Sequence, residues 1–525
     1  MVRERGKKKS IEHTVRRQQR FPAILMGEGI LVGIAAGVVV LLYRLCLEQA
    51  GEWLFKIVSF IKGKPLYVIA WFLALFFLAI LAGKLVALEP MASGSGIPQV
   101  EGEMQGSINQ TWYRVLWTKF LGGSLCMLGG LALGREGPSI QLGAMAGKGV
   151  AKGLDVGKTE EKFLLTCGAS AGLSAAFHAP LAGVMFSLEE IHKNFSVSVL
   201  LSVMTASLTA DFLCSSILGV HSVFRFQVTR AIPLENYWLL LILGIVLGAG
   251  GVLYNHGTLK VQEWYGRTLK TPVKKMLLPF FLSGLLALWA PELLGSGQKL
   301  IDSLAGGGLT VGVMLLFLVG RFLFSAFSFG SGAPGGIFFP LLVLGALLGG
   351  AFGTICHQLL GLDGSYISNF IILAMAGYFT AIVRAPLTGI ILIFEMTGSM
   401  SQLLSLAVVS VAAYVTAEFL GSKPIYESLL ERIVKGQTKA PAEEGEKLLT
   451  QFVVEQGGAM EGKQVAEVPW PDNCLLISIK RGTEEIIPKG KTRLVTGDLI
   501  VTMCDERDAP WIRTQMEALN RVNFH

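Results

Sequence analysis

The sequence predicts an all-α polytopic membrane protein with a small α+β domain at its C-terminus. Three observations lead to this prediction. Apolar residues dominate most of the chain, glycine and proline repeatedly interrupt the apolar stretches, and the composition turns polar after about residue 420. The interrupted stretches also recur as related pairs, which predicts two repeats of broken helices.

The composition is that of a membrane protein. Of 525 residues, 52% are hydrophobic and 16% are charged, whereas a soluble protein carries about 25% charged residues. A bilayer core about 30 Å thick needs about 20 apolar residues per helix. The chain also has 63 glycines, and irregular backbone is tolerated in a membrane only inside protein or along an aqueous cavity. Long apolar windows lie at 21–47, 66–86, 237–253, 312–329 and 403–420.

The segment 1–20 is basic and directly precedes the first apolar window. By the positive-inside rule, we expect the N-terminus in the cytoplasm. The window itself is longer than the apolar region of a signal peptide, so we expect it to be retained. The net charge of +7 fits basic loops at a membrane surface, and nucleic-acid binding is not expected.

The seven cysteines show neither paired nor metal-ligand spacing. Most of them lie in apolar stretches, so we expect ordinary buried thiols. We expect no metal, no cofactor and no enzymatic activity.

The C-terminal part differs in composition from the rest. The stretch 435–450 is rich in Lys, Glu, Gly and Ala, and we expect a linker there between a membrane domain at 1–434 and a C-terminal domain at 451–525. Within the latter, 474–479 and 494–502 hold β-branched residues next to turn signals. These patterns predict a small β-rich domain.

Two pairs of segments match inside the membrane part. APLAG at 179–183, followed by Glu189, matches APLTG at 385–389, followed by Glu395. GREGP likewise matches GIFFP in the second half. The pairs keep their order at nearly equal offsets, which argues against chance similarity. Transporters built from two repeats commonly bind substrate where interrupted helices of both halves meet, so these segments are candidates for a site.

Three segments couple glycine or proline to a following apolar stretch: GSGIP at 94–98, GREGP at 134–138 and GGIFFP at 335–340. Proline suits a helix start and glycine permits close backbone approach. The free N–H groups and positive dipole at such a start bind an anion without a full positive charge. Weak binding of this kind suits an ion that must also leave. Tight helix packing is the alternative interpretation of each segment alone.

Together, these segments resemble, in order and spacing, the signature motifs of the CLC chloride channel and transporter family. The resemblance covers about residues 20 to 430. It implies a homodimer in which each subunit has its own anion pathway. It also implies two inverted repeats of tilted, partly discontinuous helices.

The resemblance implies four chloride-binding groups. They are the hydroxyl of Ser95 in GSGIP, the backbone N–H groups of Ile337 and Phe338 in GGIFFP, and the hydroxyl of Tyr426. Serine at this position favours chloride over nitrate in the family, although a hydroxyl and amides do not exclude bromide or nitrate by themselves. An interfacial belt residue is the alternative role of Tyr426.

Two carboxylates are candidates for proton chemistry. Glu136 of GREGP lies in an apolar, glycine-broken segment, where a charge is costly and usually functional. An ionised carboxylate can occupy an anion site and withdraw when protonated, and Glu136 resembles the family's gating glutamate. Glu190 resembles the internal proton-transfer glutamate, which channels of the family replace by an uncharged residue. A structural role for Glu136 and a vestibular charge for Glu190 are the alternatives.

Three further charges carry weaker expectations. We expect Glu189 to form an ion pair and Arg135 to be a structural partner or a vestibule charge. Glu101 matches a family carboxylate near the dimer contact and the proton route.

Turn-rich segments in the C-terminal part resemble the TrkA-C (RCK-C type) regulatory domain of potassium-uptake systems. They do not resemble the CBS pairs of eukaryotic CLC proteins. A small ligand of unknown identity and a dimerising domain that binds nothing are both open alternatives.

The family resemblance implies proton-coupled chloride transport (H+/Cl− antiport) across a cell membrane, with both termini cytoplasmic, in a bacterial inner or plasma membrane. The expected partners are chloride, protons, the lipid bilayer and a second copy of the chain. A passive voltage- or pH-gated chloride channel, a nitrate- or fluoride-preferring member and a non-transporting anion-sensing receptor are the alternatives. Glu190 argues against the channel, and Ser95 with Tyr426 argues against altered selectivity.

Overall fold

The structure is a computed structural model of the chain. The basic segment 1–20 and most of the expected linker, 437–446, lie outside the described residues. The described residues are 21–193, 197–219, 224, 226, 230–306, 309–398, 402–436, 447–482, 484–505 and 508–520.

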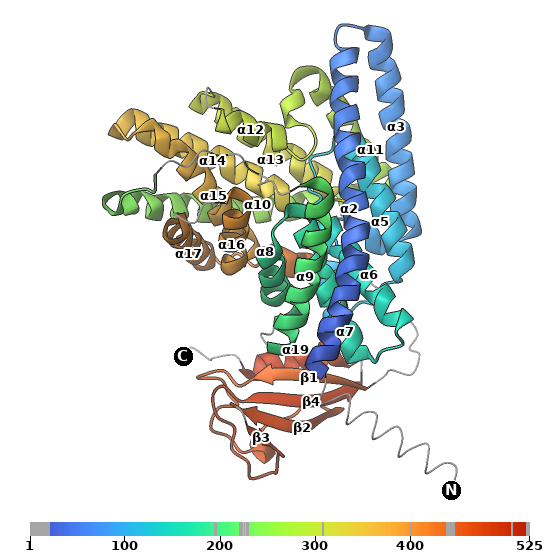
Figure 1. Ribbon diagram of the computed structural model, residues 1–525, viewed down its shortest axis with the longest axis vertical. Coiled ribbons are helices and arrows are strands. Elements are labelled where there is room, and N and C mark those ends of the chain that lie inside the picture. Colours follow the sequence, from blue (N-terminus) through green and yellow to red (C-terminus); the bar gives the residue numbers. More distant parts are fainter. Residues whose placement is uncertain are drawn as a thin grey trace. The chain divides into compact units, whose positions relative to one another are not determined.

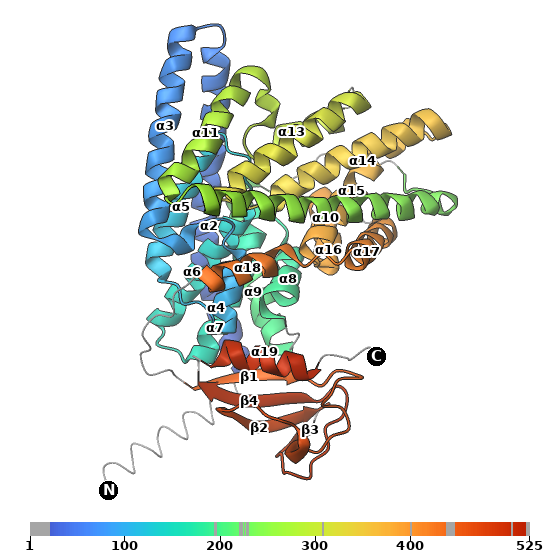
Figure 2. The same cartoon turned by 180° about the vertical axis from the view of Figure 1, so that it is seen from behind.

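Helices of very different lengths make up the membrane part (Figures 1 and 2). In Figure 1, α10, α13 and α14 are steeply inclined to the long antiparallel pair α2 and α3. The helices are α2 (Phe21–Ile61), α3 (Pro65–Leu88), α4 (Ile97–Gln105), α5 (Trp112–Leu128), α6 (Glu136–Gly153), α7 (Lys158–Phe177), α8 (Pro180–Phe186), α9 (Val197–Leu218), α10 (Tyr237–Thr268), α11 (Pro272–Trp289), α12 (Gln298–Ala305), α13 (Val311–Gly330), α14 (Phe338–Leu360), α15 (Ile367–Val383), α16 (Pro386–Thr397), α17 (Leu403–Phe419) and α18 (Ile425–Gly436).

Eight helices within the described residues are long and apolar enough to cross a membrane. The prediction of a polytopic helical protein is therefore confirmed. These spans are Ala23–Ile61, Pro65–Leu88, Val199–Leu218, Leu234–Thr268, Pro272–Trp289, Val311–Gly330, Phe338–Leu360 and Gly364–Val383.

Glycines let neighbouring helices of each repeat approach at the backbone. A β-carbon on Gly143 of α6 would lie 2.2 Å from the carbonyl oxygen of Gly168 in α7. In the second repeat, a β-carbon on Gly349 of α14 would lie 2.3 Å from the carbonyl oxygen of Phe370 in α15. Small residues at such crossings are typical of membrane helix packing, and here they pack the helix that follows each matched segment.

The chain forms two compact units. The larger unit runs up to Leu429 without the segments 101–109 and 156–162, and the smaller unit holds those two segments and the residues from Leu430 on. All residues of the candidate site described below belong to the larger unit.

The C-terminal part of the smaller unit contains an antiparallel sheet in the order β1-β4-β2-β3. This confirms the predicted small α+β domain, but β1, β3 and the helix α19 were not predicted. β1 begins at Lys447, inside the stretch expected to be a linker. β4 begins five residues later than the predicted strand, because Leu494 pairs with Lys463 and Val495 to Asp498 form a turn. The elements are β1 (Lys447–Val453), β2 (Cys474–Arg481), β3 (Glu484–Ile486), β4 (Leu499–Asp505) and α19 (Ala509–Asn520).

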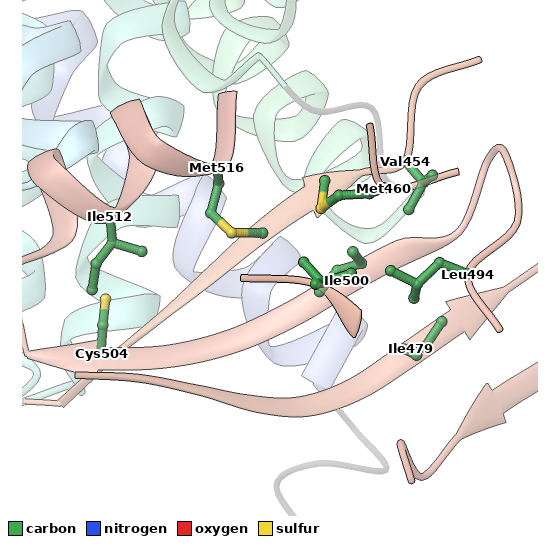
Figure 3. Close-up of a cluster of buried hydrophobic side chains, with 9 residues drawn as sticks. Val454, Met460, Ile479, Leu494, Ile500, Cys504, Ile512 and Met516 are labelled. Carbon is green, nitrogen blue, oxygen red and sulfur yellow. The ribbon is translucent and has the colours of Figure 1, made fainter. Parts of the chain in front are cut away.

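One face of this sheet packs against α19 around an apolar core. Figure 3 shows Ile512 and Met516 of α19 on the same side of the sheet as Ile500 and Cys504 of β4. Ile479 of β2 completes the contact from the neighbouring strand. Apolar side chains therefore alternate inward along β2 and β4, as expected for a sheet with one covered face.

A buried carboxylate holds the turn that precedes β4. Asp498 is 0% exposed and accepts hydrogen bonds from Arg481 Nε and Nη2, both at 2.7 Å. It also accepts from the N–H of Val495 at 2.9 Å. Burial raises the pKa of Asp498, but the hydrogen bonds lower it by a larger amount. The pKa of Asp498 therefore lies below the ordinary value.

We expect the Asp498→Asn variant to destabilise the C-terminal sheet by about 1.5 to 3 kcal/mol, the range for hydrogen bonds to charged groups. Because the folded pKa of Asp498 is depressed, its contribution is present above the ordinary pKa of about 4 and is lost as the pH falls through the folded value. Hydrogen exchange of peptides within 447–505, measured in the full chain and corrected for intrinsic rates, checks this. The exposed Glu485→Gln is the matched control, and equal protection in Asp498→Asn and wild type would contradict the prediction.

Candidate functional site

The two repeats meet at a pair of backbone hydrogen bonds. The N–H of Gly134 donates to the carbonyl oxygen of Gly336 at 2.7 Å, and the N–H of Gly336 donates to that of Gly134 at 2.8 Å. These glycines open the matched GREGP and GIFFP segments, so the sequence repeat is also a structural repeat. Since α6 begins at Glu136 and α14 at Phe338, the two helix starts are brought together.

A second reciprocal contact joins α8 and α16, which lie side by side (Figure 1). The carboxylate of Glu395 accepts from two N–H groups in the first turn of α8, at 3.0 and 2.7 Å. The carboxylate of Glu189 accepts from two N–H groups in the first turn of α16, at 3.3 and 2.9 Å, and from the hydroxyl of Thr388. The expected ion pair of Glu189 is therefore wrong. A carboxylate is instead stabilised by the free donors and positive dipole of a helix start.

The side chain of Glu136 is fully buried at the start of α14. Its Oε2 accepts a hydrogen bond from the N–H of Phe339 at 3.3 Å. Its Oε1 is buried and has no hydrogen-bond partner among the described residues. Gly134 makes room for this carboxylate, because a β-carbon there would lie 2.2 Å from Oε2. The carboxylate thus lies where a helix start binds an anion.

The start of α14 offers further backbone donors beside this carboxylate. The N–H of Leu341 donates to the carbonyl oxygen of Ile337 at 3.0 Å. The N–H groups of Ile337 and Phe338 therefore precede the hydrogen-bond ladder of the helix. The Phe338 ring packs against Phe379, with ring centroids 4.6 Å apart, and against Phe186. The donors consequently lie among apolar rings.

Two buried hydroxyls lie in the same region. Ser95 is 2% exposed and Tyr426 is 0% exposed, and neither hydroxyl has a hydrogen-bond partner among the described residues. Ser95 Oγ lies against α6, because a β-carbon on Gly137 would be 2.3 Å from it. The Tyr426 hydroxyl lies near Ser95 and within electrostatic range of Glu190 and Glu136. Unpaired buried hydroxyls are rare in folded proteins, and here two of them lie in the region of the start of α6, where Glu136 also lies.

Glu190 lies in a single π-helical turn, η2 (Ser187–His192), that continues α8. Its side chain is buried, and the turn ends at Lys193, whose φ of 53° is left-handed. A π turn changes the direction of the side chains that follow it and is frequent at functional sites. Adjacent residues of a helix point in different directions, and here Glu189 caps α16, whereas Glu190 lies within electrostatic range of Tyr426.

The remaining expected charges have other partners. Glu101 belongs to the smaller unit, where it is buried and accepts a hydrogen bond from Gln105 Nε2 at 3.1 Å. Arg135 directly precedes α6 and forms an ion pair with Glu48 at 3.3 Å.

Sequence reasoning missed the buried Lys119 of α5. Its Nζ donates to the carbonyl oxygens of Ala92 at 3.1 Å and Gly94 at 2.6 Å. A buried ammonium is costly unless it is hydrogen-bonded, so this side chain fixes the loop that carries Ser95. A cation inside the apolar stretch of α5 was the available signal.

Glu136 borders a cavity with a volume of ≈ 1190 Å³. Phe339, Arg44, Glu48 and Arg135 also line this cavity. It is large enough to admit hydrated ions to the immediate surroundings of Glu136.

Comparisons with known proteins agree with this geometry. Residues 78–418 match the family described as voltage gated chloride channel, and residues 449–510 match the TrkA-C domain. An "H(+)/Cl(-) exchange transporter ClcA" of Vibrio cholerae serotype O1 is 38% identical over 433 residues, which cover 80% of this chain and 92% of the relative. The protein of the same description from Yersinia pestis bv. Antiqua is 34% identical over 450 residues, covering 83% and 93%.

Solved structures give the same fold. A slow cyanobacterial Cl−/H+ antiporter matches with a TM-score of 0.75 and 32% identity, covering 79% of this chain and 98% of that chain. A eukaryotic CLC transporter matches in fold, with a TM-score of 0.63 and 24% identity, over 78% of this chain and 74% of its own. The chain therefore belongs to the voltage gated chloride channel (CLC) family, and it carries a TrkA-C domain after its membrane part.

Proposed function

We propose that this chain exchanges chloride for protons across a membrane. The observation that carries the proposal is the position of the Glu136 carboxylate, which accepts a hydrogen bond at the start of α14. An ionised carboxylate and an anion compete for the same donors, whereas a protonated carboxylate withdraws from that competition. Proton binding and anion binding are therefore linked at one place. The relatives described as exchange transporters support this assignment.

Four groups would hold the chloride ion: the hydroxyls of Ser95 and Tyr426 and the N–H groups of Ile337 and Phe338. Support comes from the two buried hydroxyls, which have no hydrogen-bond partner in the part of the chain that the structure describes, and from the backbone donors ahead of the α14 ladder. None of these groups carries a full charge, so the ion is held by dipoles and can leave again.

Glu190 would pass protons between the cytosolic face of the membrane and Glu136. It is a second buried acid, and both Glu190 and Glu136 lie within electrostatic range of Tyr426. A passive chloride channel would need only one of these acids, so the proton measurements below separate the two functions.

Assembly and orientation are further parts of the proposal. We assign a homodimer, as the family resemblance implies, and cytoplasmic placement of both termini, which the basic residues of 1–20 support. The division into a membrane domain at 1–434, a linker that ends before β1 at Lys447, and a regulatory domain from β1 onward rests on the change in composition, on the position of β1 and on the TrkA-C match. A small ligand would act on transport only through its different affinity for two states of the protein.

The exchange itself is tested with the purified chain in liposomes. The pH is equal on both sides at the start, and the membrane potential is clamped at zero. When chloride then leaves the liposomes, we expect the chloride gradient alone to drive protons into them. The external pH then rises, and a protonophore abolishes the rise. Chloride efflux with a constant external pH would identify a passive channel instead.

The Glu136→Gln variant tests the competition at α14. A neutral amide cannot release a proton, so we expect chloride flux to persist while proton uptake falls by about 100-fold or more. The exposed Glu235→Gln is the control that loses a carboxylate elsewhere. A Glu136→Gln protein that still moves protons at the wild-type rate would remove Glu136 from the mechanism.

The Glu190→Gln variant tests the proton relay. We expect chloride flux to remain and proton uptake to fall by about 100-fold or more, since an amide cannot relay a proton through the apolar region. Glu189→Gln is the matched control, because it loses the same charge one residue away but keeps an oxygen that can cap α16. Normal proton uptake by Glu190→Gln, or equal loss in both variants, would show that Glu190 is not the relay.

A further inference from the structure

An ionic bridge spans the wall of the cavity that Glu136 borders. Glu48 accepts a hydrogen bond from Arg44 Nε at 2.9 Å on α2, and it pairs with Arg135 Nη1 at 3.3 Å. Arg135 precedes Glu136 directly, so the bridge joins α2 to the start of α6. All four residues line the same cavity.

The two arginines are much more buried than the acid between them. The side chains of Arg44 and Arg135 are 14% and 15% exposed, whereas that of Glu48 is 44% exposed. Arg44 also has a buried guanidinium nitrogen, Nη1, without a hydrogen-bond partner among the described residues. A buried charged donor of this kind is costly to leave unpaired. A small anion in the cavity would supply the missing acceptor once the Arg44 guanidinium group turns toward the cavity.

The bridge has an unequal charge. Two guanidinium groups share the Glu48 carboxylate, and the Glu136 carboxylate next to Arg135 borders the same cavity. One positive charge of the two arginines is therefore uncompensated by these acids when Glu136 is protonated. An anion is attracted to this place, but Glu48 repels it, so the attraction stays weak enough for release.

We propose that Arg44 and Arg135 form an anion-capture position in the cavity wall, and that Glu48 is a positioning residue that sets the strength of this position. The proposal rests on the proposed function, because the captured anion is the transported chloride. Chloride waits beside Arg135 and moves to the start of α14 when the Glu136 carboxylate withdraws.

The test compares a variant that removes a negative charge with one that removes a positive charge, both in the full-length chain. Initial chloride uptake into liposomes is measured against external chloride at constant ionic strength, with isethionate as the replacement anion. Glu48→Gln removes the repulsion, so we expect the half-saturating chloride concentration and the maximal rate both to fall, by about threefold for one partly screened charge. Arg44→Gln should raise the half-saturating concentration by about the same factor, and the double variant should lie near wild type.

Glu52→Gln is the matched control. Glu52 lies one turn further along α2 and lines the same cavity, but it pairs with Lys56 at 3.3 Å and not with the arginines. It should leave the half-saturating concentration unchanged. At about 1 M salt, where the Debye length is about 3 Å, the differences among all variants should disappear.

Three results would overturn the proposal. Equal shifts in Glu48→Gln and Glu52→Gln would indicate a general field in the cavity. Shifts of the same sign in Glu48→Gln and Arg44→Gln, or no shift in either, would indicate a bridge that only holds α2 to α6. If either Glu48→Gln or Arg44→Gln is not recovered folded, the direction of the change in half-saturating chloride concentration in the other variant still decides. Chloride uptake alone is the readout, so the comparison holds even if proton coupling, and with it the proposed function, fails.

Discussion

The hydrogen-bond donors at the start of α14 are the feature on which the rest of the site depends. The Glu136 carboxylate reaches them only because Gly134 and Gly336 pair through their backbones and bring the starts of α6 and α14 together. On the proposed function, chloride uses the same donors when the carboxylate leaves. The Glu136 carboxylate and the chloride ion are both held by dipoles in apolar surroundings. Replacing one by the other therefore leaves no full charge without partners inside the protein.

Helices that begin inside a membrane protein need partners for the free N–H groups of their first turn. This fold supplies those partners from the opposite repeat. Glu395 caps α8, and Glu189 caps α16. Lys119 fixes the loop before Ser95 through two carbonyl oxygens. Each broken segment is therefore fixed by a group distant in sequence. This rigidity holds the hydroxyls of Ser95 and Tyr426 in place, although neither has a hydrogen-bond partner of good geometry among the described residues.

Local sequence features predicted much of this arrangement. Glycine and proline mark helix starts, and a glutamate in GREGP is visible as a charge in an apolar segment, so the fold class followed from local patterns. The grouping of Glu136 with Ser95, Ile337 and Phe338 was expected from the resemblance of their motifs to the CLC family. The partner of Glu189 did not follow, because a capping contact between two helices leaves no local pattern. The bridge from Arg44 to Arg135 was missed for the same reason. In the C-terminal domain, the residues of β1 up to Thr450 were taken for linker because the residues before them are polar.

Proton uptake upon chloride binding tests the competition at α14 most directly. Calorimetric titration of the purified chain with chloride, in buffers that differ in ionisation enthalpy, gives the number of protons taken up per chloride bound. The account predicts a measurable uptake in the wild-type chain, because chloride displaces an ionised Glu136 that then gains a proton, and no uptake in Glu136→Gln. Chloride binding without proton uptake in the wild-type chain across the pH range, or with equal uptake in both proteins, would contradict it.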